Sequence, residues 1–208
     1  MSGRVARSRA GTRRGTIVGM AVHVDASLPV HPLTVDDLAA MVDAGILGED
    51  DRVELLDGVL VEMSPQGPTH LAAVTRLNML VVPVAAAAGL VVTPQCPLDV
   101  LSPISQPEPD LAIVPAAGWD AYPAQALLVI EVSVTSRAID LGRKATIYAT
   151  AGIPEYWVLD LDHRRLVVHR EPAADHYETV DALTDDDTVT ATGLPLTVAV
   201  ADLLPPRR

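Results

Sequence analysis

The chain has 208 residues and a formal net charge of −12, and 49% of its residues are hydrophobic against 20% charged. This balance excludes an intrinsically disordered chain and allows one domain with a sizeable core. Phenylalanine is absent and aromatic residues make up only 3% of the chain, so the core must be built from Val, Leu, Ile and Ala.

The charge is unevenly distributed. The first 14 residues carry five arginines and no acid, whereas the chain from Met20 onward carries 10 basic and 27 acidic residues. We expect residues 1–19 to be a disordered basic tail or an upstream extension of a protein that starts at Met20, and a basic arm that touches nucleic acid is the alternative. The acidic body opposes strong non-specific binding of DNA, because phosphate neutralisation needs clustered Lys and Arg.

Neither a disulfide nor a membrane span is expected. Cys96 is the only cysteine, so no disulfide can form within the chain. The longest apolar run, residues 79–90, is short for a bilayer and is interrupted by Pro83. Because the basic N-terminal segment also lacks the apolar region of a secretory signal, we expect a cytoplasmic protein without a membrane contact.

The apolar pattern predicts one domain, residues 29–204, in which helices and strands are mixed. The expected elements, in chain order, are a helix over residues 33–47, a hairpin over 52–65, a helix over about 69–88, strands near 90–96, 110–114 and 127–136, a helix over 139–151, and a strand pair over 155–162 and 165–171. Residues 188–204 should close the sheet edge or form a small ribbon. This order predicts an α/β fold, a mixed sheet with helices packed on it.

Local signals mark the boundaries of several elements. Thr34 is the predicted N-cap of the first helix. The pair Asp57–Gly58 is the predicted turn of the hairpin. Pro83 should bend or shorten the second helix, and Gly152 should end the third.

The strand expected at LLVIEVSVTS, residues 127–136, carries a carboxylate in an apolar setting. Alternate residues of a strand share a face, so Glu131 and Ser133 project together, while Ile130 and Val132 point the other way. An ionised side chain buried without a partner costs several kcal/mol. Glu131 therefore requires a compensating positive charge nearby.

Two further acids lie in apolar strands. Asp110 opens the apolar run at residues 111–114, and Glu54 lies in the first strand of the hairpin. Together with Glu131 they can share a divalent cation, whose charge would remove the cost of burial.

Lys144 is the only lysine among the 15 basic residues. At helical spacing it shares a stripe with Asp140, Ile147, Tyr148 and Ala151, on the side expected to face the sheet. A compact ammonium on this side suits the charge that develops on a phosphate under attack. The simpler alternative is a surface pair between Asp140 and Lys144, worth about 0.2–0.5 kcal/mol.

Several motifs occur in a characteristic order. They are Glu54 in VELLDG, Met63-Ser64-Pro65 followed by His70, Pro109-Asp110, Glu131-Val132-Ser133, Lys144 in DLGRKATIYATAG, and IPEYWVLD. This ordered set resembles the Uma-two family of restriction endonucleases, within the PD-(D/E)XK nuclease superfamily. The resemblance covers residues 33–204, and its most specific part is the run from Glu131 to Asp160.

The resemblance implies a restriction-endonuclease-like fold, in which a mixed central sheet is flanked by helices and preceded by a helix and a β-hairpin. It implies that Asp110, Glu131 and the backbone carbonyl of Val132 hold Mg²⁺ or Mn²⁺. Glu54 would be an upstream acid that helps to bind the metal or orients a water. The implied activity is metal-dependent hydrolysis of DNA phosphodiester bonds.

One position departs from the superfamily pattern. The pattern places a lysine two residues after the acid, where this chain has Ser133. Lys144 would supply the missing charge from the following helix. His70 and Ser133 are further candidates for contact with the substrate or a water.

Two other functions fit parts of the sequence. A catalytically inactive nuclease fold that binds nucleic acid or protein would suit the acidic body and the displaced lysine. A purely structural domain would pair its buried acids with Arg52, Arg76 or Arg143. Metal binding separates the enzyme from the structural domain, and cleavage separates it from the binding module. A homodimer is expected for a nuclease that must cut two strands.

Overall fold

The computed structural model describes residues 29–48, 50–116 and 120–206. By its internal contacts the chain divides into residues Met1–His31 and a compact unit, Pro32–Arg208, and the fold below is that of the second unit. The tail predicted at residues 1–19 lies outside the described residues.

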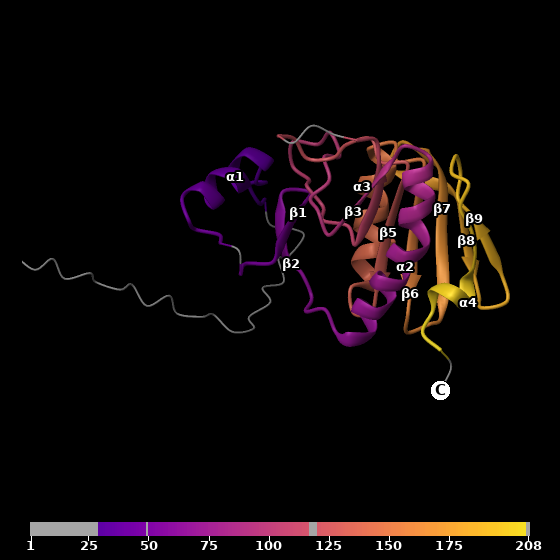
Figure 1. Ribbon diagram of the computed structural model, residues 1–208. Helices are drawn as coiled ribbons and strands as arrows, with labels where there is room; N and C mark the ends of the chain where they lie inside the picture. The colour runs from indigo at the N-terminus through magenta and orange to yellow at the C-terminus, as the bar shows by residue number, and fades with distance from the viewer. Residues whose placement is uncertain (1–28, 49, 117–119, 207–208) are drawn as a thin grey trace, which may run out of the picture. The chain divides into compact units, whose positions relative to one another are not determined.

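Helices and strands are mixed along the chain, as predicted (Figure 1). The helices are α1 (Val35–Asp43), α2 (Pro68–Ala87), α3 (Ala145–Thr150) and α4 (Val200–Leu203), and a π-helical segment, η1 (Ile139–Lys144), leads into α3. The strands are β1 (Val53–Leu56), β2 (Val59–Glu62), β3 (Val91–Pro94), β4 (Leu111–Val114), β5 (Leu128–Ser133), β6 (Glu155–Asp160), β7 (Arg165–Ala173), β8 (His176–Leu183), β9 (Thr188–Thr190) and β10 (Thr197–Ala199).

The central sheet is six-stranded, in the order β3-β4-β5-β6-β7-β8. Strands β5 and β6 pair in parallel, and the other neighbours pair antiparallel, which confirms the mixed sheet. Strand β8 was not predicted. Strands β9 and β10 form a separate two-stranded ribbon, one of the two arrangements expected for the end of the chain.

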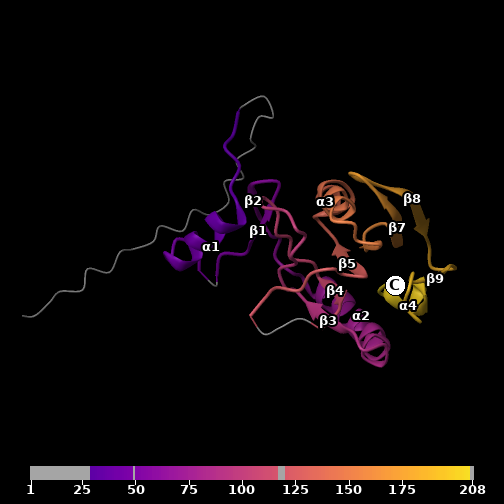
Figure 2. The same ribbon diagram turned by 90° about the horizontal axis from the view of Figure 1, so that it is seen from above.

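Two hydrophobic clusters cover the two faces of the sheet. Ile130 and Val132 of β5 pack in the cluster that contains the buried face of α2. Val129, the neighbour of Ile130 on the other face, packs with Tyr148 of α3. Figure 2 shows α2 and α3 on opposite sides of β4 and β5. The predicted alternation is therefore confirmed, and it directs Glu131 toward the α3 side.

Helix α2 runs through Pro83 to Ala87, which confirms the helix predicted over about residues 69–88. Of the two effects expected of Pro83, shortening does not occur, and a bend stays a prediction. One face of the helix is buried against the sheet, and this packing holds the helix together where the proline removes a backbone donor. At 20 residues and a mean hydropathy of 1.4, α2 is long and apolar enough to cross a membrane by length and composition alone. The core helix of a protein meets the same criteria, and one face of α2 is buried against the sheet.

The helix and hairpin before the sheet follow their local signals. Thr34 caps α1 as predicted: its Oγ1 accepts from the backbone N–H of Asp37, and the Asp37 carboxylate accepts from the N–H of Thr34. The hairpin turns at Asp57 and Gly58, both with positive φ. A side chain at Gly58 would also clash with Pro32, so this position requires glycine.

Candidate active site

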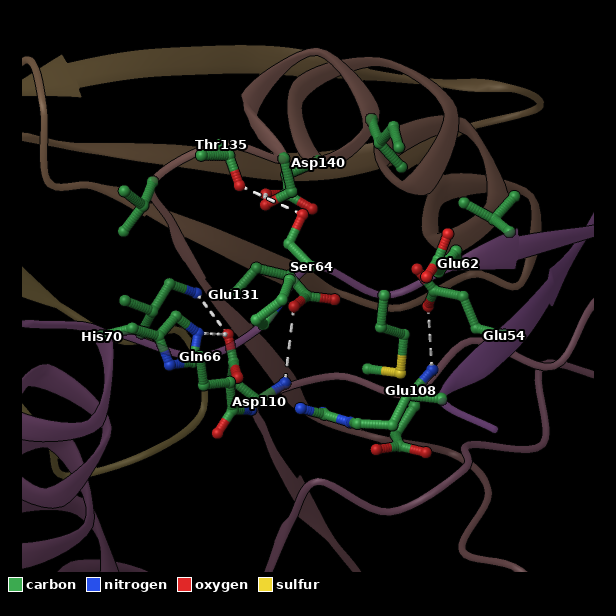
Figure 3. Close-up of a pocket in the computed structure, with 18 of the residues that line it drawn as sticks. Glu54, Glu62, Ser64, Gln66, His70, Glu108, Asp110, Glu131, Thr135 and Asp140 are labelled. Carbon is green, nitrogen blue, oxygen red and sulfur yellow. Dashed lines mark hydrogen bonds and ion pairs between the residues drawn. The ribbon is translucent and has the colours of Figure 1, made fainter. Parts of the chain in front are cut away.

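A pocket of about 270 Å³ opens among β1, the start of α2, the segment before β4, the end of β5 and η1 (Figure 3). Most of the predicted site residues line it: Glu54, His70, Asp110, Glu131, Val132 and Lys144. They come from segments separated by up to 90 positions in the sequence. Ser133 is fully buried in β5 and does not line this pocket.

Glu131 lies on β5 with 4% of its surface exposed. Its Oε1 accepts hydrogen bonds from Lys144 Nζ at 2.9 Å and from Tyr148 Oη at 3.1 Å. Its Oε2 accepts a longer one, 3.4 Å, from the backbone N–H of Asp110. Burial raises the pKa of Glu131 well above its ordinary value, and the Lys144 ammonium opposes this shift only in part.

Lys144 connects two buried acids. Its Nζ lies 2.9 Å from Glu54 Oε2 and 2.9 Å from Glu131 Oε1. Burial alone would lower the pKa of Lys144, but the carboxylates of Glu131 and Glu54 outweigh it and raise the pKa, so the ammonium stays charged. The alternative of a surface pair with Asp140 is wrong, because Lys144 is buried and its ion pairs are with the two glutamates.

Asp110 is held immediately before β4. Its Oδ2 accepts from the backbone N–H of Val132 at 2.8 Å and lies 3.1 Å from His70 Nε2 (Figure 3). The Nδ1 atom of His70 is buried without a hydrogen-bond partner in the described part of the chain. The backbone N–H of Val132 thus contacts Asp110. A contact between the Val132 carbonyl and a metal stays a prediction.

Glu54 enters the site from β1. Its Oε2 accepts from the backbone N–H of Glu108 at 3.2 Å and forms an ion pair with Lys144. Glu108 also lines the pocket, and burial raises the pKa of its carboxyl. Glu108 lies outside any strand and was not predicted from the sequence.

Asp140 is a further buried acid of the pocket, with 2% of its surface exposed. Ser136 Oγ donates to its Oδ2 at 2.5 Å, and burial raises its pKa against the opposing charge of Lys144. From the sequence, Asp140 was placed on the same helix stripe as Lys144, but the only role suggested for it was a surface pair with Lys144. Its position on the inward stripe of the helix was the signal that could have identified it.

The π-helical turn of η1 carries both Asp140 and Lys144 into the protein. A π-turn is wider than an α-turn, and such segments occur often at functional sites. The helix continues as α3, so that Tyr148 follows Lys144 by four positions and faces the same carboxylate. Gly152, with φ of 70°, ends this helix as predicted.

The buried charges of the pocket are unbalanced. Four buried acids, Glu54, Asp110, Glu131 and Asp140, surround one buried lysine. Among the described residues, no group of three or more His, Cys, Asp and Glu side chains is arranged so that it could hold a metal ion. The excess of carboxylate oxygens nevertheless fits Mg²⁺ or Mn²⁺, since Mg²⁺ uses one or two carboxylates and retains several waters.

The mixed sheet and the buried acids around Lys144 are the features expected from the resemblance to restriction-endonuclease-like nucleases. The fold is similar to a crystal structure from Anabaena variabilis, described as "a putative nuclease belonging to DUF820", with a TM-score of 0.62 and 17% identity over 83% of this chain and 97% of that one. The Uma2 family model, described as "Putative restriction endonuclease", matches residues 35–201, and the chain belongs to this family. A search of the curated proteins gives no match. The fold and family predicted from the sequence are confirmed.

The structural-domain alternative named Arg52, Arg76 and Arg143 as partners of the buried acids. Among the described residues none of the three forms an ion pair with the acids of the predicted site. Arg143 pairs with the half-exposed Asp57 at 3.5 Å and not with a buried acid. The buried glutamates pair instead with Lys144, which is the arrangement that the resemblance implies.

Proposed function

We propose that this nuclease-family protein is a metal-dependent endonuclease that hydrolyses DNA phosphodiester bonds with Mg²⁺ or Mn²⁺. The observation that carries the proposal is the position of Lys144, whose ammonium lies 2.9 Å from both Glu54 and Glu131 in the pocket that contains Asp110. Family membership supports the nuclease reaction.

Asp110 and Glu131 would hold the cation, with the carbonyl of Val132 and the carboxylate of Glu54 as further donors. When bound, a divalent ion supplies charge that stabilises the phosphate and lowers the pKa of a water. Asp110 suits this role because its Oδ2 is fixed by two donors, the Val132 N–H and His70.

Lys144 supplies charge and does not act as a base. Glu54 and Glu131 keep it protonated and hold its Nζ between them. A fixed, buried ammonium stabilises the negative charge that develops on the phosphate and requires little reorganisation. Lys144 thus replaces the lysine of the superfamily pattern, whose position is occupied by Ser133.

His70 and Ser133 remain candidates for contact with the substrate or a water. His70 lines the pocket and contacts Asp110 Oδ2, so it can also orient that carboxylate. Ser133 shares a strand face with Glu131. Its side chain is fully buried, so a water or phosphate could contact it only after the surrounding side chains move.

The competing function is a nuclease fold that binds nucleic acid or protein without turnover. The displaced lysine was one reason to consider it, and the contact between Lys144 and Glu131 weakens that reason. The acidic composition of the body remains its main support.

The test is a nicking assay on supercoiled plasmid with Mg²⁺ or Mn²⁺. Asp110→Asn, Glu131→Gln and Lys144→Met should each lower the rate by about 100-fold or more, because each removes a charge from the site at nearly constant volume. Glu178→Gln, an exposed change on β8, is the matched control and should retain activity.

Nicking that survives all three site variants would place the activity in a contaminant or at another site. If the wild type cleaves neither duplex nor single-stranded DNA with either metal, the endonuclease proposal fails. Retarded migration of DNA in a gel under those conditions would then support the binding module.

A further inference from the structure

Tyr148 has no part in the reaction proposed above, yet its hydroxyl points at the central acid. The side chain is fully buried on α3, and its Oη donates to Glu131 Oε1 at 3.1 Å. The same oxygen accepts from Lys144 Nζ at 2.9 Å.

The hydrogen-bond donors at Glu131 are unequally divided between its two oxygens. Oε1 takes the hydroxyl of Tyr148 and the ammonium of Lys144, whereas Oε2 takes only the 3.4 Å contact from the Asp110 N–H. Asp110 shows the same division: its Oδ2 takes Val132 and His70, and its Oδ1 takes no hydrogen bond from the described residues. Each carboxylate therefore keeps one oxygen with capacity to bind a ligand.

Lys144 alone would not fix the orientation of the Glu131 carboxylate, because its ammonium also forms an ion pair with Glu54, 2.9 Å away. A tyrosine ring is rigid and has few rotatable bonds, and this ring packs against Tyr156 with 4.8 Å between the ring centroids. A phenol is protonated near neutral pH, so the Tyr148 hydroxyl is available as a donor.

We propose that Tyr148 is a positioning residue that holds Oε1 of Glu131, so that Oε2 is the oxygen presented to the divalent cation beside Asp110. This inference rests on the proposed function. Hydrogen bonds to the far side of a ligand commonly contribute 10- to 100-fold to metal affinity. Tyr148 would thus act on the metal through Glu131, without touching the substrate.

The first experiment measures Mn²⁺ binding by isothermal titration calorimetry, with no nucleic acid present. Tyr148→Phe should raise the Kd for Mn²⁺ about 10-fold. Tyr177→Phe is the matched control, because it removes a buried hydroxyl that donates to the Ile153 carbonyl at 3.0 Å, away from the pocket. Its Kd should equal that of the wild type.

A second pair of variants separates the hydrogen bond from packing. Tyr148→4-fluorophenylalanine fills nearly the volume of tyrosine but has no donor, and Tyr148→4-aminophenylalanine retains one. The fluoro variant should bind Mn²⁺ as weakly as Tyr148→Phe, and the amino variant should restore most of the affinity. This comparison remains informative if Tyr148→Phe folds poorly, because the cavity is avoided.

The outcomes separate this inference from the proposed function. If the wild type binds Mn²⁺, Asp110→Asn does not, and every Tyr148 variant binds as the wild type does, the positioning role is overturned and the endonuclease proposal stands. Equal weakening by the fluoro and amino variants would also overturn it, since only packing would then matter. If the wild type itself does not bind Mn²⁺, the metal-dependent reaction fails, and the role of Tyr148 fails with it.

Discussion

At the scale of single residues, the site depends on one buried lysine among several buried acids. Lys144 is 4% exposed, and both of its carboxylate partners are similarly buried. Removal of one member of a buried ion pair leaves an uncompensated charge, which is far more costly than the loss of a surface pair.

We therefore expect Lys144→Met to lower the free energy of unfolding of the metal-free protein by about 3 kcal/mol. Urea denaturation monitored by circular dichroism measures this change. The double variant Lys144→Met with Glu54→Gln should recover part of the loss, because one of the two unpaired charges is gone. A double variant less stable than Lys144→Met would show that unpaired carboxylates do not cause the loss of stability.

A second residue-scale effect concerns pH. His169 lies on β7, stacks on Tyr156 with 5.2 Å between the ring centroids, and is 5% exposed. Burial lowers the pKa of His169 below its ordinary value of 6.5. The unfolded chain then binds a proton at this position at a pH where the folded chain does not, so stability falls as the pH drops below about 6.5.

His169→Phe should accordingly reduce the loss of stability between about pH 6.5 and pH 5, as measured by thermal unfolding across this range. His176→Gln is the control, because that side chain is exposed at the start of β8. Parallel pH profiles for the wild type and His169→Phe would show that His169 does not titrate differently on folding.

At the scale of elements, helix α2 contains a proline, the residue that is least favourable inside an α-helix. Pro83 lies on the exposed side of the helix and lacks the N–H that would bond to the carbonyl four residues earlier. Pro83→Ala should raise the free energy of unfolding by about 2 kcal/mol, because the restored hydrogen bond outweighs the added freedom of the unfolded chain. Chemical denaturation measures the gain, and Val82→Ala controls for a change at an exposed neighbour.

Elements with a strong local signal were predictable from the sequence. Thr34 and the Asp57–Gly58 turn act within a few residues, and the structure bears out both. Glu131 was assigned to its face because a strand alternates strictly, and Lys144 stood out because the chain has no other lysine. These features depend on short-range geometry, which the sequence contains directly.

The remaining features depend on partners distant in the sequence. Helix α2 continues through Pro83 because the sheet buries its other face, a tertiary effect that propensity does not contain. Strand β8 has mostly exposed or half-buried residues and pairs only at the sheet edge, so its apolar pattern is weak. Asp140 suggested a local pair with Lys144, but the glutamates of β1 and β5 compete for the ammonium more effectively.

At the scale of the whole molecule, the net negative charge of the protein opposes the binding of DNA, the proposed substrate. From Met20 onward the chain carries 27 acidic and 10 basic residues, and the pocket itself has an excess of acids. A polyanion would be repelled from such a site unless a cation neutralised it. A homodimer would double both the number of sites and the negative charge, and sedimentation equilibrium would measure whether it forms.

The binding of DNA should therefore depend on divalent cations before any bond is cleaved. With Ca²⁺, which binds oxygen ligands as Mg²⁺ does, we expect the Kd for a short duplex to be at least about 10-fold lower than in EDTA at the same ionic strength. Fluorescence anisotropy measures both values. Asp110→Asn should lose the effect of Ca²⁺, whereas Glu178→Gln on β8 should retain it. Equal affinity in Ca²⁺ and EDTA would mean that the pocket does not use a cation to overcome its own charge.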